Sequence, residues 1–141
     1  MTTTLDLTAA GLDALRSAID GELYLPGEGD YDAARMPWNV AVDQRPAAVA
    51  LPTNARDVSE ITAFARSLGL RVAPQGTGHN PAPLGDLSDV ILVRTSAMTE
   101  VCIDPVARIA KIQAGALWEH VVAPAAAHGL VALHGSSPDV G

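Results

Sequence analysis

One short segment of the sequence combines residue types that could do chemistry. Residues 74–80 read Pro-Gln-Gly-Thr-Gly-His-Asn, with two glycines at alternate positions directly before a histidine. Glycines let the backbone adopt positive φ and expose consecutive N–H groups, and a concave run of such amides binds a diphosphate without lysine or arginine. The neutral imidazole of His79 is a good nucleophile near pH 7. The segment therefore suits an anion-binding loop with a nucleophile at its end.

Two better-known phosphate-binding patterns do not fit this segment. A Walker A loop needs Gly-Lys-Ser/Thr, and a Rossmann fingerprint needs a third glycine and a helix that begins in the loop. A glycine turn that carries an exposed histidine without any function fits the same letters and is the commoner case. The pattern alone leaves the functional and the non-functional interpretation open.

Regular elements are predicted on both sides of the loop. Apolar runs predict strands at 48–51, 70–73 and 90–93, a hairpin at 100–103 and 108–113 that turns at Asp104-Pro105, and a last strand at 131–133. Helical spacing of apolar residues predicts helices at 8–19, 54–68 and 118–128. The loop thus follows a strand, as a ligand loop at the carboxyl end of a strand should.

Local signals predict several helix ends. Thr8 and Asn54 are expected to be N-caps, with Asp57 three residues after Asn54. Gly69 supplies a left-handed stop for the second helix. Pro124 is expected to kink the last helix or restart its turn.

The order of the elements indicates an α/β or α+β fold, in which small sheets are flanked by helices. The 141 residues fit one domain. We expect residues 1–43 to form an amino-terminal helix and an irregular connection, which extends over 21–45 where Pro and Gly recur. Residues 44–141 are expected to form the domain that carries the loop.

Composition argues against several classes of protein. Hydrophobic residues make up 48% of the chain, enough for a core, and the formal charge of −7 argues against a nucleic-acid partner. No apolar stretch approaches the roughly 20 residues that a membrane helix needs, and no signal peptide is visible, so we expect no membrane partner and a cytoplasmic location. Cys102 is the only cysteine, which excludes an intrachain disulfide, and we interpret it as a strand residue. The acidic cluster at 28–32 lacks calcium-loop spacing, so no metal site is expected.

A longer series of features resembles a known family. Arg-Pro precedes the strand at 48–51, Pro-Thr-Asn-Ala-Arg-Asp-Val opens the helix after it, and the next strand leads into Gly-x-Gly-His-Asn. Gln-Ala-Gly-Ala follows the hairpin, His-Gly-Leu ends the last helix, and Gly-Ser-Ser-Pro-Asp-Val-Gly occupies residues 135–141. This order over residues 44–141 resembles the start of the FAD-binding domain of the PCMH-type (vanillyl-alcohol-oxidase-like) flavoproteins. The likeness is closest to the berberine-bridge-enzyme-like oxidoreductases.

The resemblance implies the cofactor and the residues that bind it. Backbone amides of the loop would cradle the diphosphate of FAD, and a ring nitrogen of His79 would bond covalently to the C8 methyl group of the flavin. Some relatives have a cysteine in the later loop as a second covalent link; Ser137 stands at that place here, so we expect a single link. The implied cofactor-binding residues come from two loops: Gln75, Gly76, Thr77, Gly78, His79 and Asn80, and then Ser136, Ser137, Asp139, Val140 and Gly141.

The resemblance also implies an activity. Relatives are FAD-linked oxidases or dehydrogenases that pass hydride from a small alcohol- or sugar-like molecule to flavin N5. They continue past the position of Gly141 with further flavin contacts, a substrate domain and a catalytic base. We therefore expect this chain to hold part of one FAD-binding domain, no catalytic residue and no activity alone. Two alternatives stay open: a non-catalytic remnant, and a phosphate- or nucleotide-binding module without covalent flavin.

The other histidines and the tryptophans receive plainer interpretations. His120 and His128 are predicted on one helix, eight residues apart, too far for one metal ion, and are interpreted as surface residues. His134, next to the later loop, is a weaker candidate for approaching the flavin. Trp38 and Trp118 are interpreted as packing residues.

Overall fold

The structure is a computed structural model, and it describes residues 9–141. The predicted cap Thr8 lies outside these residues. A short 3-10 helix at Ala82–Leu84 occupies part of the loop before β4. The helices and strands follow in the order α1 (Ala9–Ala18), β1 (Glu22–Tyr24), α2 (Tyr31–Arg35), β2 (Ala48–Leu51), α3 (Ala55–Ser67), β3 (Arg71–Gln75), β4 (Val90–Arg94), β5 (Val101–Asp104), β6 (Ile109–Ile112) and α4 (Trp118–Ala126).

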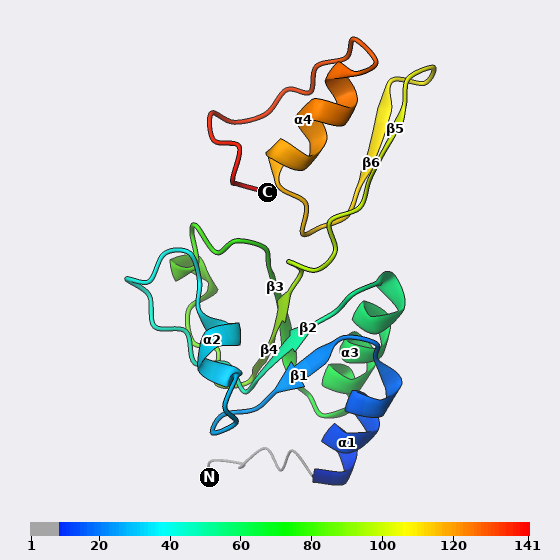
Figure 1. Ribbon diagram of the computed structural model, residues 1–141. Coiled ribbons are helices and arrows are strands. Elements are labelled where there is room, and N and C mark those ends of the chain that lie inside the picture. The colour runs from blue at the N-terminus through cyan, green and yellow to red at the C-terminus, as the bar shows by residue number, and fades with distance from the viewer. Residues whose placement is uncertain (1–8) are drawn as a thin grey trace.

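Four strands form one sheet in the order β1-β2-β4-β3 (Figure 1). β2, β4 and β3 run parallel, whereas β1 pairs antiparallel with β2 at the edge. The first four residues of β4 are all buried, as expected of a parallel strand covered on both faces. The unbroken apolar run at 90–93 thus correctly predicted a covered strand.

Helices cover both faces of this sheet. On one face α1 and α3 bury Leu12 and Ile61 against Ile91 of β4. On the other face Tyr31 of α2 packs in a second core with Leu92. Adjacent residues of β4 therefore serve opposite cores, as the period of a strand requires. Figure 1 shows α1 and α3 together on one side of the sheet and α2 on the other, and the predicted α/β class is confirmed.

The β5–β6 hairpin and α4 form a second, smaller unit beyond the four-stranded sheet (Figure 1). The two strands pair antiparallel, and α4 packs on β5. The hairpin turns at Asp104, whose carboxylate accepts hydrogen bonds from the amides of Val106 and Ala107. The predicted hairpin and helix are therefore confirmed. α4 runs unbroken through Pro124, so the helix does not restart there, and the alternative, a kink at Pro124, stays a prediction.

The predicted irregular connection at 21–45 is wrong in part, because it contains β1 and α2. β1 has three residues, of which only Leu23 is buried, so the sequence shows no alternation of apolar and polar residues that would predict a strand. β1 forms because it pairs with the free edge of β2. Gly21 permits this pairing, since a Cβ at that position would overlap the carbonyl oxygen of Leu51.

The predicted strand at 131–133 is also wrong. Val131 and Leu133 are 88% and 99% exposed, and within residues 9–141 this stretch pairs with no strand. Apolar residues make a strand only where another backbone satisfies its N–H and C=O groups.

The prediction that Cys102 is a strand residue is confirmed, because it lies exposed on β5. No helix in the described part of the chain is both long and apolar enough to span a bilayer.

The amino terminus of α3 is fixed by a buried carboxylate. Asn54 caps the helix as predicted, because its side chain accepts a hydrogen bond from the amide of Asp57 at 3.0 Å. The fully buried carboxylate of Asp57 in turn accepts from the amides of Asp20, Gly21 and Thr53 at 2.9–3.1 Å. Burial raises the pKa of Asp57, but these hydrogen bonds outweigh it and hold the pKa below the ordinary 3.8.

We predict that Asp57→Asn lowers the free energy of unfolding by about 2 kcal/mol at pH 7, because an amide group cannot accept all of these bonds. Since the folded pKa lies below 3.8, the stabilisation is present above that pH and is lost as the pH falls through the folded value. The deficit of the variant should therefore shrink at pH 3. Urea unfolding of the parent and the variant at pH 7 and pH 3 measures the difference in unfolding free energy. Glu60→Gln removes a charge from the same helix without a buried acceptor, and an equal loss there would contradict the assignment.

Candidate functional site

The predicted loop begins at the end of β3, where Gln75 is the last strand residue. Its carbonyl accepts a hydrogen bond from the amide of Thr95, just after β4, at 3.2 Å. Its buried side-chain amide exchanges two hydrogen bonds with that of Gln44, at 2.9 and 3.0 Å. The loop therefore starts from a fixed point at the carboxyl ends of two parallel strands, the edge where α/β sheets bind ligands.

The backbone of the loop is oriented with its carbonyls toward the protein. The carbonyl oxygens of Thr77 and Gly78 accept from the amides of Trp38 and Asn39, at 2.9 and 3.2 Å. Gly78 has φ +77°, which favours glycine. Within residues 9–141 the amides of residues 76–80 find no acceptor of their own. Such a run of unpaired N–H groups has the chemistry of an anion nest.

The two glycines of the loop differ in what they require. A Cβ on Gly78 would come within 2.8 Å of Cβ and 3.0 Å of Cα of Pro37. A Cβ on Gly76 would meet nothing closer than Thr95 and Ala114, each at 3.9 Å, and Gly76 has no positive φ. The alternate spacing therefore predicted a strained position correctly for Gly78 only. The fold itself would accept a side chain at residue 76, so only a molecule bound at the loop could require glycine there.

His79 is held from two sides. Its ring stacks on the indole of Trp38, with centroids 4.2 Å apart and planes 15° apart. Its Nδ1 lies 2.6 Å from Oγ1 of Thr77. The interpretation of Trp38 as a packing residue is wrong, because the residue is 64% exposed and its contact is with the candidate nucleophile.

The later loop, residues 135–141, lies against the start of α4. The carbonyls of Pro138 and Val140 accept from the first amides of that helix, both at 3.0 Å. Ser137 donates a hydrogen bond to Asp139, which lowers the pKa of that carboxyl group; the nearby His79 lowers it further. Asp139 therefore lies within electrostatic range of the first loop.

Two hollows meet at the first loop. One has a volume of about 350 Å³ and is lined by residues 74–80, Leu84, Ala114 and Gly141. The other, of about 470 Å³, is lined from the sheet side by Gly76 and Thr77 and from the α4 side by Asp139. Pockets of this size hold cofactor-sized groups. The structure thus brings the first loop together with Asp139 and Gly141, whereas Ser136, Ser137 and Val140 line neither hollow.

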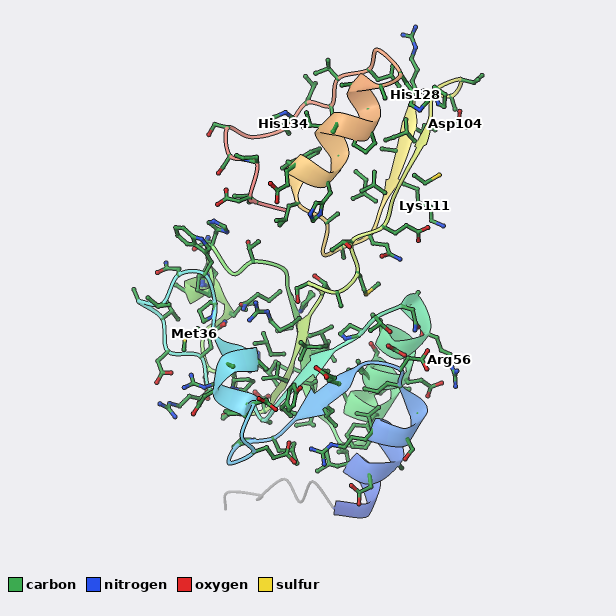
Figure 2. All side chains as sticks on the ribbon, viewed as in Figure 1. Met36, Arg56, Asp104, Lys111, His128 and His134 are labelled. Carbon is green, nitrogen blue, oxygen red and sulfur yellow. The ribbon has the colours of Figure 1, made fainter. Side chains whose placement is uncertain are left out.

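The larger hollow also contains residues that sequence reasoning missed. Met36, which follows α2 (Figure 2), lines it together with Arg94 at the end of β4. The guanidinium of Arg94 donates to the carbonyls of Ala34 and Met36 at 3.0 and 2.6 Å, and its Nε is buried without an acceptor among the described residues. Burial lowers the pKa of Arg94. The sequence signal that could have identified Arg94 is a charged residue at the end of a buried apolar strand. The remaining unpredicted lining residues are Pro37, Trp38, Ser96, Thr99, Gly115, Leu117 and His120.

The other histidines fall in different places. His120 lies at the surface as predicted, where it lines the larger hollow; its Nδ1 also accepts from the amide of Leu117 at 3.1 Å and so caps the start of α4. His134 lies on the connection after α4 (Figure 2) and stacks on Trp118 with centroids 5.4 Å apart.

The acidic cluster at 28–32 is engaged in ion pairs rather than gathered around a metal site. Glu28 pairs with Arg16 and Asp32 pairs with Arg35, and among residues 9–141 only Asp30 of the three acidic residues has no ion-pair partner. Across residues 9–141 no three acidic, histidine or cysteine side chains are grouped as metal ligands.

Comparisons with known proteins identify the family. The model of the FAD binding domain family matches residues 46–141. The chain is 31% identical over 124 residues to (R)-6-hydroxynicotine oxidase of Paenarthrobacter nicotinovorans, covering 88% of this chain and 27% of that protein. It is 31% identical over 108 residues to xylooligosaccharide oxidase of Thermothelomyces thermophilus, covering 74% and 22%. The chain thus spans about a quarter of the length of these relatives.

Solved structures show the same fold. The crystal structure of 6-hydroxy-D-nicotine oxidase from Arthrobacter nicotinovorans superposes with a TM-score of 0.78 and 28% identity, over 100% of this chain and 28% of that one. The wild-type BBE-like 1 of Physcomitrella patens gives a TM-score of 0.78 at 24% identity, over 92% and 29%, which shows the fold. The chain therefore belongs to the FAD binding domain family, and its fold is that of the berberine-bridge-enzyme-like oxidoreductases.

Proposed function

We propose that the protein is an FAD-dependent oxidoreductase, and that this chain supplies the part that holds the cofactor. When bound, FAD supplies the redox chemistry by accepting hydride at N5 from an alcohol- or sugar-like small molecule. The relatives that support this are oxidases of 6-hydroxynicotine and of xylooligosaccharides. The chain's own residues bind, orient and electronically adjust the cofactor.

The observation that carries the proposal is the run of unpaired amides at residues 76–80. These residues are half-buried or exposed, so a diphosphate bound here would supply acceptors in place of water. No lysine lies in the loop to do this by charge. The adjoining hollows of about 350 and 470 Å³ leave room for the rest of the molecule on either side of the diphosphate. The residues present therefore fit the cofactor.

We further propose that His79 carries the flavin covalently. A ring nitrogen replaces one hydrogen of the C8 methyl group, so that a C–N bond forms and two protons leave, one from the methyl group and one from the imidazole. The two electrons of the broken C–H bond would be taken up by the flavin and then by dioxygen, which would leave as hydrogen peroxide with the two protons. The link withdraws electrons from the flavin and raises its reduction potential, which favours hydride transfer from an alcohol.

The test of this proposal is His79→Ala in the full-length protein. The parent should keep its yellow colour through acid precipitation, and peptide mass mapping should find flavin on the peptide that contains His79. The variant should lose all acid-stable flavin while still binding FAD reversibly, because the amides of the loop are unchanged. His128→Ala, at an exposed histidine after α4, is the matched control.

Two results would contradict parts of the proposal. Flavin attached to another residue, or acid-stable flavin in His79→Ala, would remove the covalent role of His79. A parent that binds phosphate or a nucleotide but no FAD would instead favour a phosphate-binding module, and a parent that binds neither would favour a non-catalytic remnant.

A further inference from the structure

Arg94, the last residue of β4, is a half-buried cation without a carboxylate partner among the described residues. The two other arginines that are not exposed, Arg16 and Arg35, each pair with acidic side chains. Burial lowers the pKa of Arg94, and no neighbouring carboxylate raises it again. Charges that proteins take out of water are normally paired, so the guanidinium of Arg94 has the environment of a group that an anion completes.

The fold uses only one nitrogen of this guanidinium. Nη1 donates to the carbonyls of Ala34 and Met36 at 3.0 and 2.6 Å, which fixes the end of α2 to β4. Nε and Nη2 have no acceptor in the part of the chain that the structure describes; Nε is buried, whereas Nη2 keeps access to solvent. Holding α2 in place therefore leaves Nη2 free to donate to a bound molecule.

The sheet places Arg94 beside the start of the first loop. The parallel register of β3 and β4 pairs Arg94 with Gln75, and neighbouring strands lie about 4.8 Å apart. The next residue after Gln75 is Gly76, where the run of unpaired amides begins. Arg94, Gly76 and Thr77 also line the same hollow of about 470 Å³. A single anion in this hollow can thus meet both the guanidinium and the first amides of the loop.

We propose that Nη2 of Arg94 binds the diphosphate of FAD together with the amides of Gly76 and Thr77. This inference deepens the proposed function and rests on it, but not on the covalent role of His79. A hydrogen bond from a guanidinium to a phosphate oxygen is about twice as strong as one between neutral groups. The loop itself contains no lysine or arginine, and the site takes its cation from the next strand. Asp139 lines the hollow from the α4 side, and its negative charge favours the guanidinium side for the anion.

The experiment measures the binding of three ligands to the full-length protein that carries His79→Ala, so that no covalent step enters. The ligands are FAD, inorganic diphosphate and riboflavin, which has no phosphate. Arg94→Met keeps the length of the side chain without its charge, and should weaken FAD and diphosphate binding by roughly tenfold to hundredfold. Riboflavin binding should change by less than about threefold, because riboflavin makes no charge-assisted bond there. Arg94→Lys, which keeps the charge, should recover part of the lost affinity.

The matched control is Arg56→Met, at an exposed arginine on α3 that lines neither hollow (Figure 2). It removes the same charge from the protein and should leave the affinity for all three ligands unchanged. Added salt should weaken diphosphate binding more when Arg94 is present than in Arg94→Met, because salt screens the charge–charge contact.

A direct readout separates binding from the structural role of Arg94 at α2. Arg94→Met also loses the hydrogen bonds to Ala34 and Met36, and urea unfolding of the unliganded proteins measures that loss by itself. The side-chain N–H signals of Arg94 in nitrogen-15 NMR, assigned by their absence in Arg94→Lys, should shift as inorganic diphosphate is added. The shift should saturate at the concentrations that saturate binding.

The outcomes that overturn the inference differ from those that overturn the proposed function. Parental affinity for FAD and diphosphate in Arg94→Met overturns the role of Arg94 alone. An equal loss of affinity for FAD, diphosphate and riboflavin, with no shift of the Arg94 signals, reduces Arg94 to a structural contact of α2. A His79→Ala protein that binds neither FAD nor diphosphate overturns the proposed function and this inference with it.

Discussion

Gly115→Ala should destabilise the protein by roughly 3 kcal/mol or more, because the added methyl group has no space at all. A Cβ at this position would overlap the carbonyl oxygen of Thr95 and lie 2.6 Å from its carbon and 3.0 Å from the carbonyl oxygen of Met98. These are backbone atoms and cannot rotate away. The amide of Gly115 also donates to the carbonyl of Met98 at 2.8 Å, so the two segments cannot separate without losing that bond.

The effect should extend from stability to the cofactor site. Gly115 lies where the chain returns from the hairpin past the end of β4, and it lines the larger hollow. Pushing this segment away from Thr95 moves α4 and the later loop relative to the first loop. Guanidinium unfolding and FAD uptake should therefore both be impaired in Gly115→Ala.

A matched control exists in the same junction. Gly76→Ala adds the same group toward Thr95 and Ala114 but reaches them only at 3.9 Å, an ordinary van der Waals contact. Its unfolding free energy in the absence of FAD should stay within about 0.5 kcal/mol of the parent. If Gly115→Ala unfolds like Gly76→Ala, the close approach to Thr95 is not present in the folded protein.

Most of the central fold could be predicted from the sequence because its signals are local. The buried run at 90–93, the cap Asn54 and the stop Gly69 each depend on residues a few positions apart. Gly69 has φ +68°, as its place after α3 predicts. β1 could not be predicted this way, because three residues with one buried side chain carry no period, and the strand exists only through its pairing with β2. The missing strand at 131–133 shows the converse, since its residues have the right composition but no neighbour.

In the candidate site, too, the features that depend on neighbouring residues were predictable and those that depend on distant residues were not. The first loop could be predicted because its glycines and histidine are consecutive. Trp38 and Arg94 could not, since Trp38 contacts the loop from about forty positions upstream and Arg94, on the next strand, only lines the same hollow. Their contacts are a ring stack and hydrogen bonds to backbone carbonyls, neither of which leaves a pattern in one sequence. The environment of His79 therefore had to come from the structure.

Gly78→Ala is expected to destabilise the protein by about 2–3 kcal/mol and to abolish FAD uptake. Gly78 has φ +77°, where an alanine costs about 1 kcal/mol. The new Cβ would also meet Pro37 at 2.8 Å, and such overpacking adds about 1–2 kcal/mol. Relief of the clash moves residues 36–39 away from the loop, which removes the hydrogen bonds from Trp38 and Asn39 to the carbonyls of Thr77 and Gly78. The backbone arrangement that leaves the amides of residues 76–80 open to an anion would then be lost.

Gly69→Ala separates the two contributions. Gly69 also has positive φ, at +68°, but nothing lies within 4 Å of a Cβ there. It should lose only about 1 kcal/mol of unfolding free energy and keep full FAD uptake. Urea unfolding of the apoprotein and titration with FAD, on both variants side by side, measure the difference. Equal stability and equal FAD affinity in Gly78→Ala and Gly69→Ala would mean that Pro37 does not press on the loop and that residues 36–39 do not shape the nest. A Gly78→Ala protein that is destabilised yet binds FAD normally would mean that residues 36–39 contact the loop for stability only, and that the loop amides are not the diphosphate site.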